Sequence, residues 1–224
     1  SVTFALAENA HHNGVAFEKE AEVTAIEKHE DADGKPWFEV MAGGKTYQTR
    51  IIINCAGGCS DKINNMVSED HYHIIPRFGA HVVLDRKISD KLTTTLMETP
   101  HDLPGGGHTK GMAIIPTTGG TMILGCDATE VDDPDFTATR RASIDQIVDY
   151  FKEAWKYLPL DGDEFPMESV IGIFGGCRPH ADTNDFVIGE AEDAPGFINA
   201  GGTESPGFTS AVAIARHVVQ IAAE

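Results

Sequence analysis

An arginine flanked by glycines is the residue of this chain best suited to hold an anion. Arg178 lies in the run Gly175-Gly176-Cys177-Arg178-Pro179, which follows a strand predicted over residues 167–174. A guanidinium on a rigid strand end binds a carboxylate or phosphate through two parallel hydrogen bonds, and neighbouring glycines let another group approach the backbone closely. We therefore predict that Arg178 captures an anionic group, in preference to the alternative of a surface arginine in an ion pair.

A histidine in an apolar strand pattern is the candidate for proton transfer. His81 precedes Val82 and Val83, and an imidazole titrates near neutrality, so it can take the hydroxyl proton of a substrate during oxidation. A lone strand histidine is often structural, and both interpretations stay open. No metal site is predicted, because no known ligand spacing and no completing carboxylate accompany the other histidines considered, which are His71, His73, His101 and His108.

A glycine-rich turn near the carboxyl end has the composition of a ligand-binding turn. Residues 197–210 predict a buried strand, a turn through Gly201 and Gly202, and a helix with Ser205 as its N-cap and Pro206 at its first position. The free amides of such a helix start favour anions or electron-rich atoms. Glu204 lies inside the turn, either as a carboxylate favoured by the helix dipole or facing a substrate. The predicted apolar face of the helix comprises Phe208, Ala211, Val212, Ala215, Val218, Val219 and Ala222.

A second stretch repeats this pattern. Residues 50–63 run from an apolar strand through Ile53-Asn54-Cys55-Ala56-Gly57-Gly58 into a short predicted helix, and share Ile-Asn and Ala-Gly-Gly with residues 198–202. Two strands that end in the same small-residue turn suggest neighbouring positions in one α/β sheet, with a ligand at their carboxyl ends. Alternatively, each glycine pair only makes a tight turn.

The remaining chain predicts the elements that position these residues. A helix is expected over 1–13 with Gly14 as its C-cap, then strands over 15–28, 37–41 and 46–54. A β-rich block follows, with strands over 71–85, 112–115, 122–126 and 167–174 and one long helix over 139–157. We therefore expect an α/β (α+β) fold: two segments of one α/β domain, 1–70 and 191–224, enclose a β-sheet domain over 71–190, and the site lies between the two domains.

Composition excludes several classes of partner. The formal net charge is -18, from 35 acidic and 17 basic residues, and such a surface disfavours binding to nucleic acid or anionic lipid. No apolar run is long enough to span a bilayer. The four cysteines form no Cys-x-x-Cys pair, so reduced thiols and a cytoplasmic location are expected. Because a helix opens the chain without a preceding methionine, we expect the sequence to be an excerpt from a longer protein.

Five motifs in order resemble those of the D-amino-acid-oxidase-like (DAO) family of FAD-dependent oxidoreductases. Within the family, the resemblance is to the branch of anaerobic glycerol-3-phosphate dehydrogenase and L-2-hydroxyglutarate dehydrogenase. The motifs are residues 22–26 (Glu-Val-Thr-Ala-Ile), 53–57 (Ile-Asn-Cys-Ala-Gly), 75–79 (Ile-Pro-Arg-Phe-Gly), 174–179 (Phe-Gly-Gly-Cys-Arg-Pro) and 201–207 (Gly-Gly-Thr-Glu-Ser-Pro-Gly). The fold implied is part of a Rossmann-like FAD-binding domain plus a substrate domain with a mixed or antiparallel sheet.

The resemblance also implies roles for individual residues. Arg178 would bind the anionic group of a small substrate, with Arg77 and Glu204 as further substrate contacts, and His81 matches a catalytic histidine of the glycerol-3-phosphate branch. Flavin would accept hydride from a carbon that bears a hydroxyl or an amine. The residues implied in FAD binding are Val23, Ala56, Gly57, Gly176, Gly201, Gly202, Gly207, Phe208 and Thr209.

Two departures from the family pattern limit these implications. The strand–Gly-x-Gly-x-x-Gly–helix that holds the FAD pyrophosphate is absent, so we expect these 224 residues alone to bind FAD weakly and to show no turnover. Glycerol-3-phosphate enzymes usually carry a lysine where this chain has residues 203–206, which puts that substrate in doubt and favours a 2-hydroxy acid or another small anion. An amine oxidase of the glycine or sarcosine type and a non-catalytic binding module are the alternatives. The electron acceptor is left open.

Overall fold

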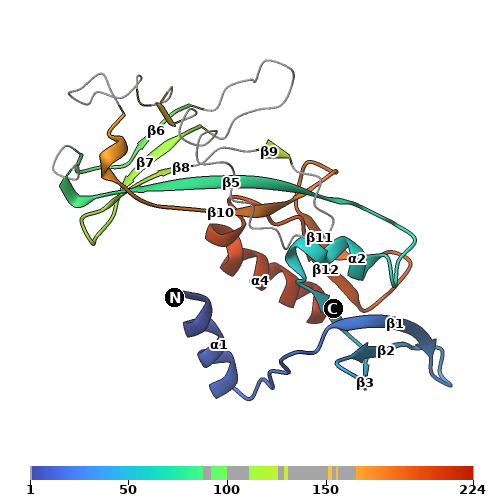
Figure 1. Ribbon diagram of the computed structural model, residues 1–224. Coiled ribbons are helices and arrows are strands. Elements are labelled where there is room, and N and C mark those ends of the chain that lie inside the picture. The colour runs from blue at the N-terminus through green and yellow to red at the C-terminus, as the bar shows by residue number, and fades with distance from the viewer. Residues whose placement is uncertain are drawn as a thin grey trace.

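The computed structural model describes residues 2–87, 92–99, 111–125, 129–130, 151–152, 155 and 165–223 (Figure 1). The strands form three sheets. A meander joins β1 (Val23–Glu30), β2 (Pro36–Ala42) and β3 (Lys45–Thr49). A second sheet has the order β11-β12-β4, from Val187–Glu190, Phe197–Gly201 and Ile52–Asn54. The chain therefore combines antiparallel and parallel pairing with helices, which is a mixed α/β fold.

The third and largest sheet has six strands in the order β10-β5-β8-β7-β6, with β9 also paired to β5. Its two longest strands, β5 (Ile74–Leu84) and the edge strand β10 (Val170–Ala181), pair antiparallel along nearly their whole length (Figure 1). The shorter strands are β6 (Leu96–Met97), β7 (Ala113–Pro116), β8 (Met122–Gly125) and β9 (Thr129–Glu130), and a short 3-10 turn, Met167–Ser169, leads into β10.

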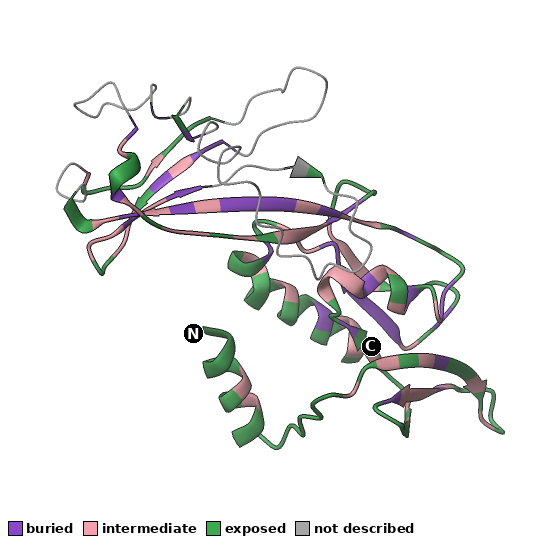
Figure 2. Ribbon diagram, viewed as in Figure 1, coloured by how far each residue is buried: buried purple, intermediate pink, exposed green. Residues whose placement is uncertain are grey.

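Three hydrophobic clusters hold these sheets (Figure 2). The largest covers one face of the long sheet and includes Phe78, Val82 and Leu124 with Phe151 and Trp155. The second joins the meander to the second sheet through Phe38 and Phe197, and the third lies between β12 and the last helix, α4 (Gly207–Ala223). The second cluster thus attaches the meander to strand β12, and the third attaches helix α4 to the same strand.

Several predicted elements are confirmed. The first helix is α1 (Val2–His12), and Gly14 follows it with a φ of 90°. The strands predicted over 112–115 and 122–126 correspond to β7 and β8. The helix predicted over 139–157 lies outside the described residues, apart from residues 151, 152 and 155, which are helical. The domain boundaries at residues 70 and 190 stay predictions.

Three strand predictions need correction. The strand expected from residue 15 begins only at Val23, because residues 15–20 are exposed and Glu20 has a φ of 54°. The strand expected over 46–54 is two strands in different sheets, since β3 pairs with β2 and β4 pairs with β12. The strand predicted to end at residue 174 continues to Ala181, so the glycines before Arg178 lie inside the ladder with β5.

The apolar face predicted for the last helix is also wrong in part. Helix α4 packs through Ile214, Val218 and Ile221, together with Ala222, whereas Phe208 and Val212 are exposed. Apolar residues surround much of this helix, so their spacing alone does not select the buried face. The helix begins after Pro206, whose carbonyl accepts a hydrogen bond from the amide of Ser210, so the predicted N-cap at Ser205 is one residue early.

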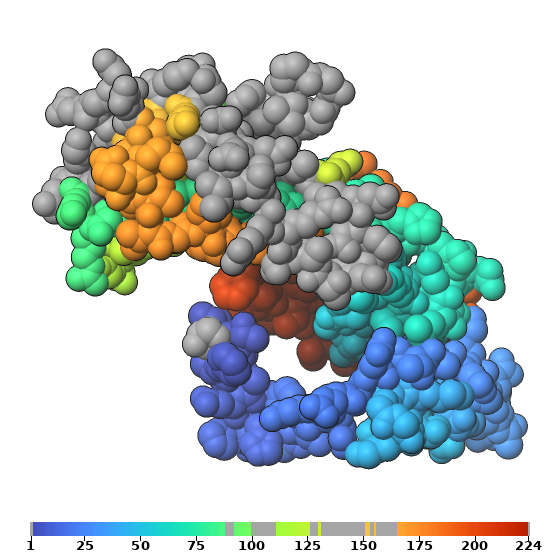
Figure 3. All heavy atoms as spheres, in the orientation of Figure 1, coloured from blue at the N-terminus to red at the C-terminus, as the bar shows by residue number. Residues whose placement is uncertain are grey.

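Helix α1 is the least attached element of the structure. It has no buried residue, and its apolar side chains Val2, Phe4 and Leu6 are exposed. In the space-filling view an opening separates it from α4 and from the meander (Figure 3). Among the described residues, no helix combines the length and the apolar character needed to cross a bilayer.

Candidate functional site

The two repeated stretches of the sequence are direct neighbours in the structure. Strands β4 and β12 pair in parallel, with Ile53 opposite Ile198 and Asn54 opposite Asn199. Both glycine-rich turns therefore follow the carboxyl ends of adjacent parallel strands, as the repeated pattern predicted. Gly57 and Gly202 have φ values of 57° and 63°, a left-handed conformation that glycine adopts at little cost. These turns create the type of edge at which α/β sheets bind ligands.

A buried chain of asparagines fixes the register of these two strands. The amide nitrogen of Asn54 donates to Oδ1 of Asn199 over 2.9 Å and to the carbonyl of Ser60 over 2.8 Å. Asn199 in turn donates to Oδ1 of Asn64, on α2 (Ser60–Asn64), over 2.8 Å. All three asparagines are buried. Each therefore depends on the others for its hydrogen bonds, because little water reaches them.

The buried side chain of Tyr72 packs against the second glycine turn at Gly201. The hydroxyl of Tyr72 and the Oγ of Ser60 lie so close to Gly201 that a Cβ there would overlap the phenol oxygen. Burial raises the pKa of Tyr72 to about 12. The phenol therefore stays protonated at neutral pH, and its role at this turn is packing.

The candidate anion and proton residues share one face of the long sheet. In the β5–β10 ladder, Arg77 is paired with Arg178 and His81 with Phe174. Directly paired residues of antiparallel strands point to the same face, and alternate residues along each strand join them. The opposite face packs into the large hydrophobic cluster. The sheet thus presents two arginines and a histidine on the face away from its core.

Glycines on the neighbouring strands leave space for the side chains of Arg178 and His81. A Cβ at Gly79 would overlap the guanidinium of Arg178, and a Cβ at Gly125 would overlap the imidazole of His81. The His81 ring also stacks on Phe174, with ring centres 4.9 Å apart and an interplanar angle of 5°. The two predicted site residues are therefore held flat against the sheet by glycines on the neighbouring strands.

A polar cluster links the second glycine turn to this face. Oε1 of Glu204 lies 3.1 Å from Nδ1 of His180 and 3.7 Å from Nη1 of Arg77, while Nη2 of Arg77 lies 3.1 Å from Oε1 of Glu130. The side chains of Glu204 and His180 are only 13% and 11% exposed. The carboxylate thus connects the turn after β12 to strands β5 and β10.

His180 is the site residue that the sequence analysis missed. It lies on β10 two positions after Arg178, and alternation along a strand places these two residues on the same face. This spacing of two residues was the feature of the sequence that could have identified His180. Once β10 was predicted to end before Arg178, no reason remained to group His180 with the candidate site.

We expect Glu204→Gln to lower the free energy of unfolding by about 1–3 kcal/mol, because a hydrogen-bonded charge among buried partners is lost. Glu130→Gln is the matched control: it removes the other carboxylate beside Arg77, but this side chain is 62% exposed and should contribute little. Urea unfolding of both variants measures the difference. Equal effects would show that Glu204 does not hold the turn to the sheet.

The other residues predicted to bind FAD, and the other histidines considered, lie in several different elements. Val23 starts β1 and packs partly buried against the cluster that contains Phe197. Ala56 is exposed after β4, and Phe208 and Thr209 are exposed at the start of α4. His71 and His73 lie in the connection before β5, and His101 and His108 fall outside the described residues. The roles of all these residues in binding stay predictions.

Two glycines of the predicted FAD site, one in the first turn and one on β10, have open space beside them. A Cβ at Gly57 or at Gly176 would meet no atom within 4 Å, so both positions border open space. Helix α4 begins beside the second turn, and the first amides of a helix favour an anionic group such as a pyrophosphate. A cavity of about 360 Å³ lies elsewhere, between residues 64–72 and 183–191, and includes neither Arg178 nor His81.

Comparison with known proteins gives a consistent result. The family model described as FAD dependent oxidoreductase (DAO) matches residues 1–221. A glycerol 3-phosphate dehydrogenase of Caloramator mitchellensis is 37% identical over 219 residues, which are 98% of this chain and 42% of that protein. A glycerol 3-phosphate oxidase of Mycoplasma genitalium is 30% identical over 93% of this chain and 52% of its own length. The chain thus spans about half the length of the curated relatives it matches.

Solved structures give the same fold. The L-α-glycerophosphate oxidase of Mycoplasma pneumoniae with FAD bound has a TM-score of 0.73 and 25% identity, over 98% of this chain and 54% of that one. The glycine oxidase of Bacillus cereus has the same TM-score at 17% identity, over 98% of this chain and 54% of that one. The second likeness concerns the fold alone.

Proposed function

Because this chain belongs to the DAO family of FAD-dependent oxidoreductases, we propose that the intact protein oxidises glycerol 3-phosphate at a carbon that bears a hydroxyl group. The observation that carries the proposal is the placement of Arg178 and His81 on one face of the β5–β10 ladder. The relatives named as acting on glycerol 3-phosphate support this choice of substrate. The expected lysine is absent from the second turn, so a 2-hydroxy acid is the comparison substrate.

In this proposal the anion is held at the arginine end of the ladder. The guanidinium of Arg178 lies over Gly79 in a fixed position and binds the phosphate or carboxylate of the substrate through two hydrogen bonds. Arg77 already has carboxylates at two of its nitrogens. Its contribution is therefore the smaller, because paired charges attract a further anion less strongly.

Four positions along β5 from Arg77, His81 accepts the proton of the substrate hydroxyl. Stacking on Phe174 fixes the plane of the imidazole, so its nitrogens face a limited set of directions. Ala56, Gly57 and the turn through Gly201 and Gly202 would hold FAD, and the first amides of α4 would favour its anionic pyrophosphate. Bound FAD would supply the hydride acceptor for oxidation of the hydroxyl-bearing carbon.

Anaerobic titration of the intact protein tests this function. We expect glycerol 3-phosphate to bleach the visible flavin band, and L-2-hydroxyglutarate and glycine to do so far more slowly. His81→Ala should slow flavin reduction by about 100- to 10,000-fold, as expected when a general base is lost, with little change in substrate affinity. His73→Ala, an exposed histidine before β5, is the matched control. If reduction is equally fast in the His81 variant, His81 is not the base; bleaching by glycine alone would make the protein an amine oxidase.

A further inference from the structure

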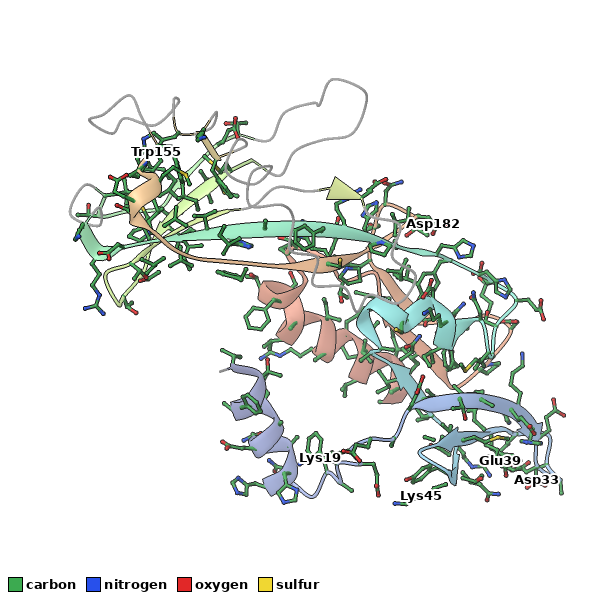
Figure 4. The ribbon with its side chains drawn as sticks, in the orientation of Figure 1. Lys19, Asp33, Glu39, Lys45, Trp155 and Asp182 are labelled. Carbon is green, nitrogen blue, oxygen red and sulfur yellow. The ribbon has the colours of Figure 1, made fainter. Side chains whose placement is uncertain are left out.

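We propose that Glu27, His29 and Glu39 form a binding site for a divalent transition-metal cation, for which Zn²⁺ is the best-matched probe. One ligand atom from each residue lies within 4.8 Å of the other two. The three residues lie on the β1–β2 hairpin of the meander, in a different sheet from Arg178 and His81. Figure 4 labels Glu39 on this hairpin. The site is thus separate from the proposed reaction.

The register of the hairpin brings the three side chains to one face. Glu27 pairs directly with Glu39, and His29 pairs with Trp37. Alternation then places all four on the face opposite Ile26 and Phe38, which are buried in the second cluster. A cation between these side chains would bridge two adjacent strands and face solvent on its open side.

The distance between two of the three ligand atoms is close to that of a zinc site. Zinc binds imidazole nitrogen and carboxylate oxygen at about 2.0–2.2 Å, so two ligand atoms of a tetrahedral site lie about 3.4 Å apart. Nε2 of His29 is 3.7 Å from Oε2 of Glu27. That separation is too long for a hydrogen bond. The distance between these two atoms would need to shorten only slightly for both to bind one metal ion.

The imidazole is held in place with a nitrogen available to a ligand. His29 stacks on Trp37, with ring centres 4.4 Å apart and an interplanar angle of 21°. Its Nε2 is shielded from solvent and, among the described residues, has no hydrogen-bond partner. A shielded polar atom without a partner destabilises the folded state. Coordination of a metal would remove this cost.

Electrostatics favours a cation at the same point. Carboxylates at directly paired positions repel each other, and within the described part of the chain no lysine or arginine forms an ion pair with Glu27 or Glu39. Glu39 receives only a long contact of 3.5 Å from the amide of Gln48. A net charge of -18 raises the local concentration of cations around the protein. One imidazole and two carboxylates suit zinc, with water completing the fourth position.

Calorimetric titration of the intact, chelator-treated protein with Zn²⁺ tests the site. We expect saturable binding of one equivalent, a higher melting temperature with Zn²⁺, and a change in the fluorescence of Trp37. His29→Gln and Glu39→Gln should each weaken binding by about 10- to 100-fold, since a lost ligand costs at least as much as a lost outer partner. Glu30→Gln is the matched control, because Glu30 ends the same strand but points to its other face.

A second measurement keeps the test decisive if a variant folds poorly. Co²⁺ bound to the unaltered protein should give the visible spectrum of nitrogen and oxygen ligands. A thiolate charge-transfer band would instead place the metal at a cysteine and overturn the proposal. Absence of saturable Zn²⁺ binding, or equal loss of affinity in the Glu30 control and the His29 variant, would overturn it as well.

Discussion

Arg178→Ala in the intact enzyme is expected to lower kcat/KM for glycerol 3-phosphate by about 100- to 1,000-fold, mostly through KM. Two hydrogen bonds from a guanidinium to an anion contribute together about 3–4 kcal/mol, and each 1.36 kcal/mol corresponds to a factor of ten. Arg178→Lys should recover only part of the loss, because an ammonium group cannot form the paired, planar contact. Steady-state kinetics with substrate concentrations up to saturation separates KM from kcat.

A glycine substitution tests the same role without touching the arginine. The guanidinium lies where a Cβ of Gly79 would be, so Gly79→Ala must displace it and should weaken substrate binding in the same direction as Arg178→Ala. Gly172→Ala is the matched control on β10, because a Cβ there meets no atom within 4 Å. Normal kinetics in the Gly79 variant, with a folded protein, would show that the observed position of Arg178 is not the one that binds substrate.

The pairing of the two glycine turns could be predicted from the sequence because it is a local pattern repeated twice. Each strand is short, apolar and followed by the same small residues, and adjacent parallel strands place such turns at one edge. The register of Asn54 with Asn199 agrees with that prediction. The family match over residues 1–221 likewise agrees with the five motifs.

The contacts between distant segments could not be predicted in the same way. Glu204 and His180 are 24 residues apart, and they meet only because the turn after β12 folds onto β10. The strand end before Arg178 was misplaced because glycines usually interrupt strands. Here both glycines pair with β5 inside the ladder. The ring of Phe78 from β5 fills the space where a Cβ of Gly175 would lie, whereas Gly176 borders open space. Local propensity gives no information about such neighbours.

Replacement of Asn199 is expected to destabilise the protein strongly, because its side chain is hydrogen-bonded to two other buried side chains. Asn199→Leu removes the hydrogen bonds to Asn54 and Asn64 and leaves a buried donor and a buried acceptor without their partners. Each unsatisfied buried group costs about 1–3 kcal/mol, so the free energy of unfolding should fall by about 2–6 kcal/mol. Asn65→Ala removes an exposed side chain whose Oδ1 accepts a 3.3 Å hydrogen bond from Asn64. It should change the free energy of unfolding by less than about 1 kcal/mol, because the same Asn64 nitrogen also donates to the carbonyl of Asp70.

A double-mutant cycle decides whether the asparagines act as a unit. In Asn54→Leu/Asn199→Leu the bond between the two side chains is lost once, whereas each single variant leaves the other asparagine unsatisfied. The double variant should therefore lose less stability than the sum of the two single losses. Strictly additive losses, measured by urea unfolding, would mean that each asparagine is stabilised independently. The shared Ile-Asn and Ala-Gly-Gly would then reflect the turns alone, and the register of β4 on β12 would have to come from the apolar packing around Phe197 and Ile198.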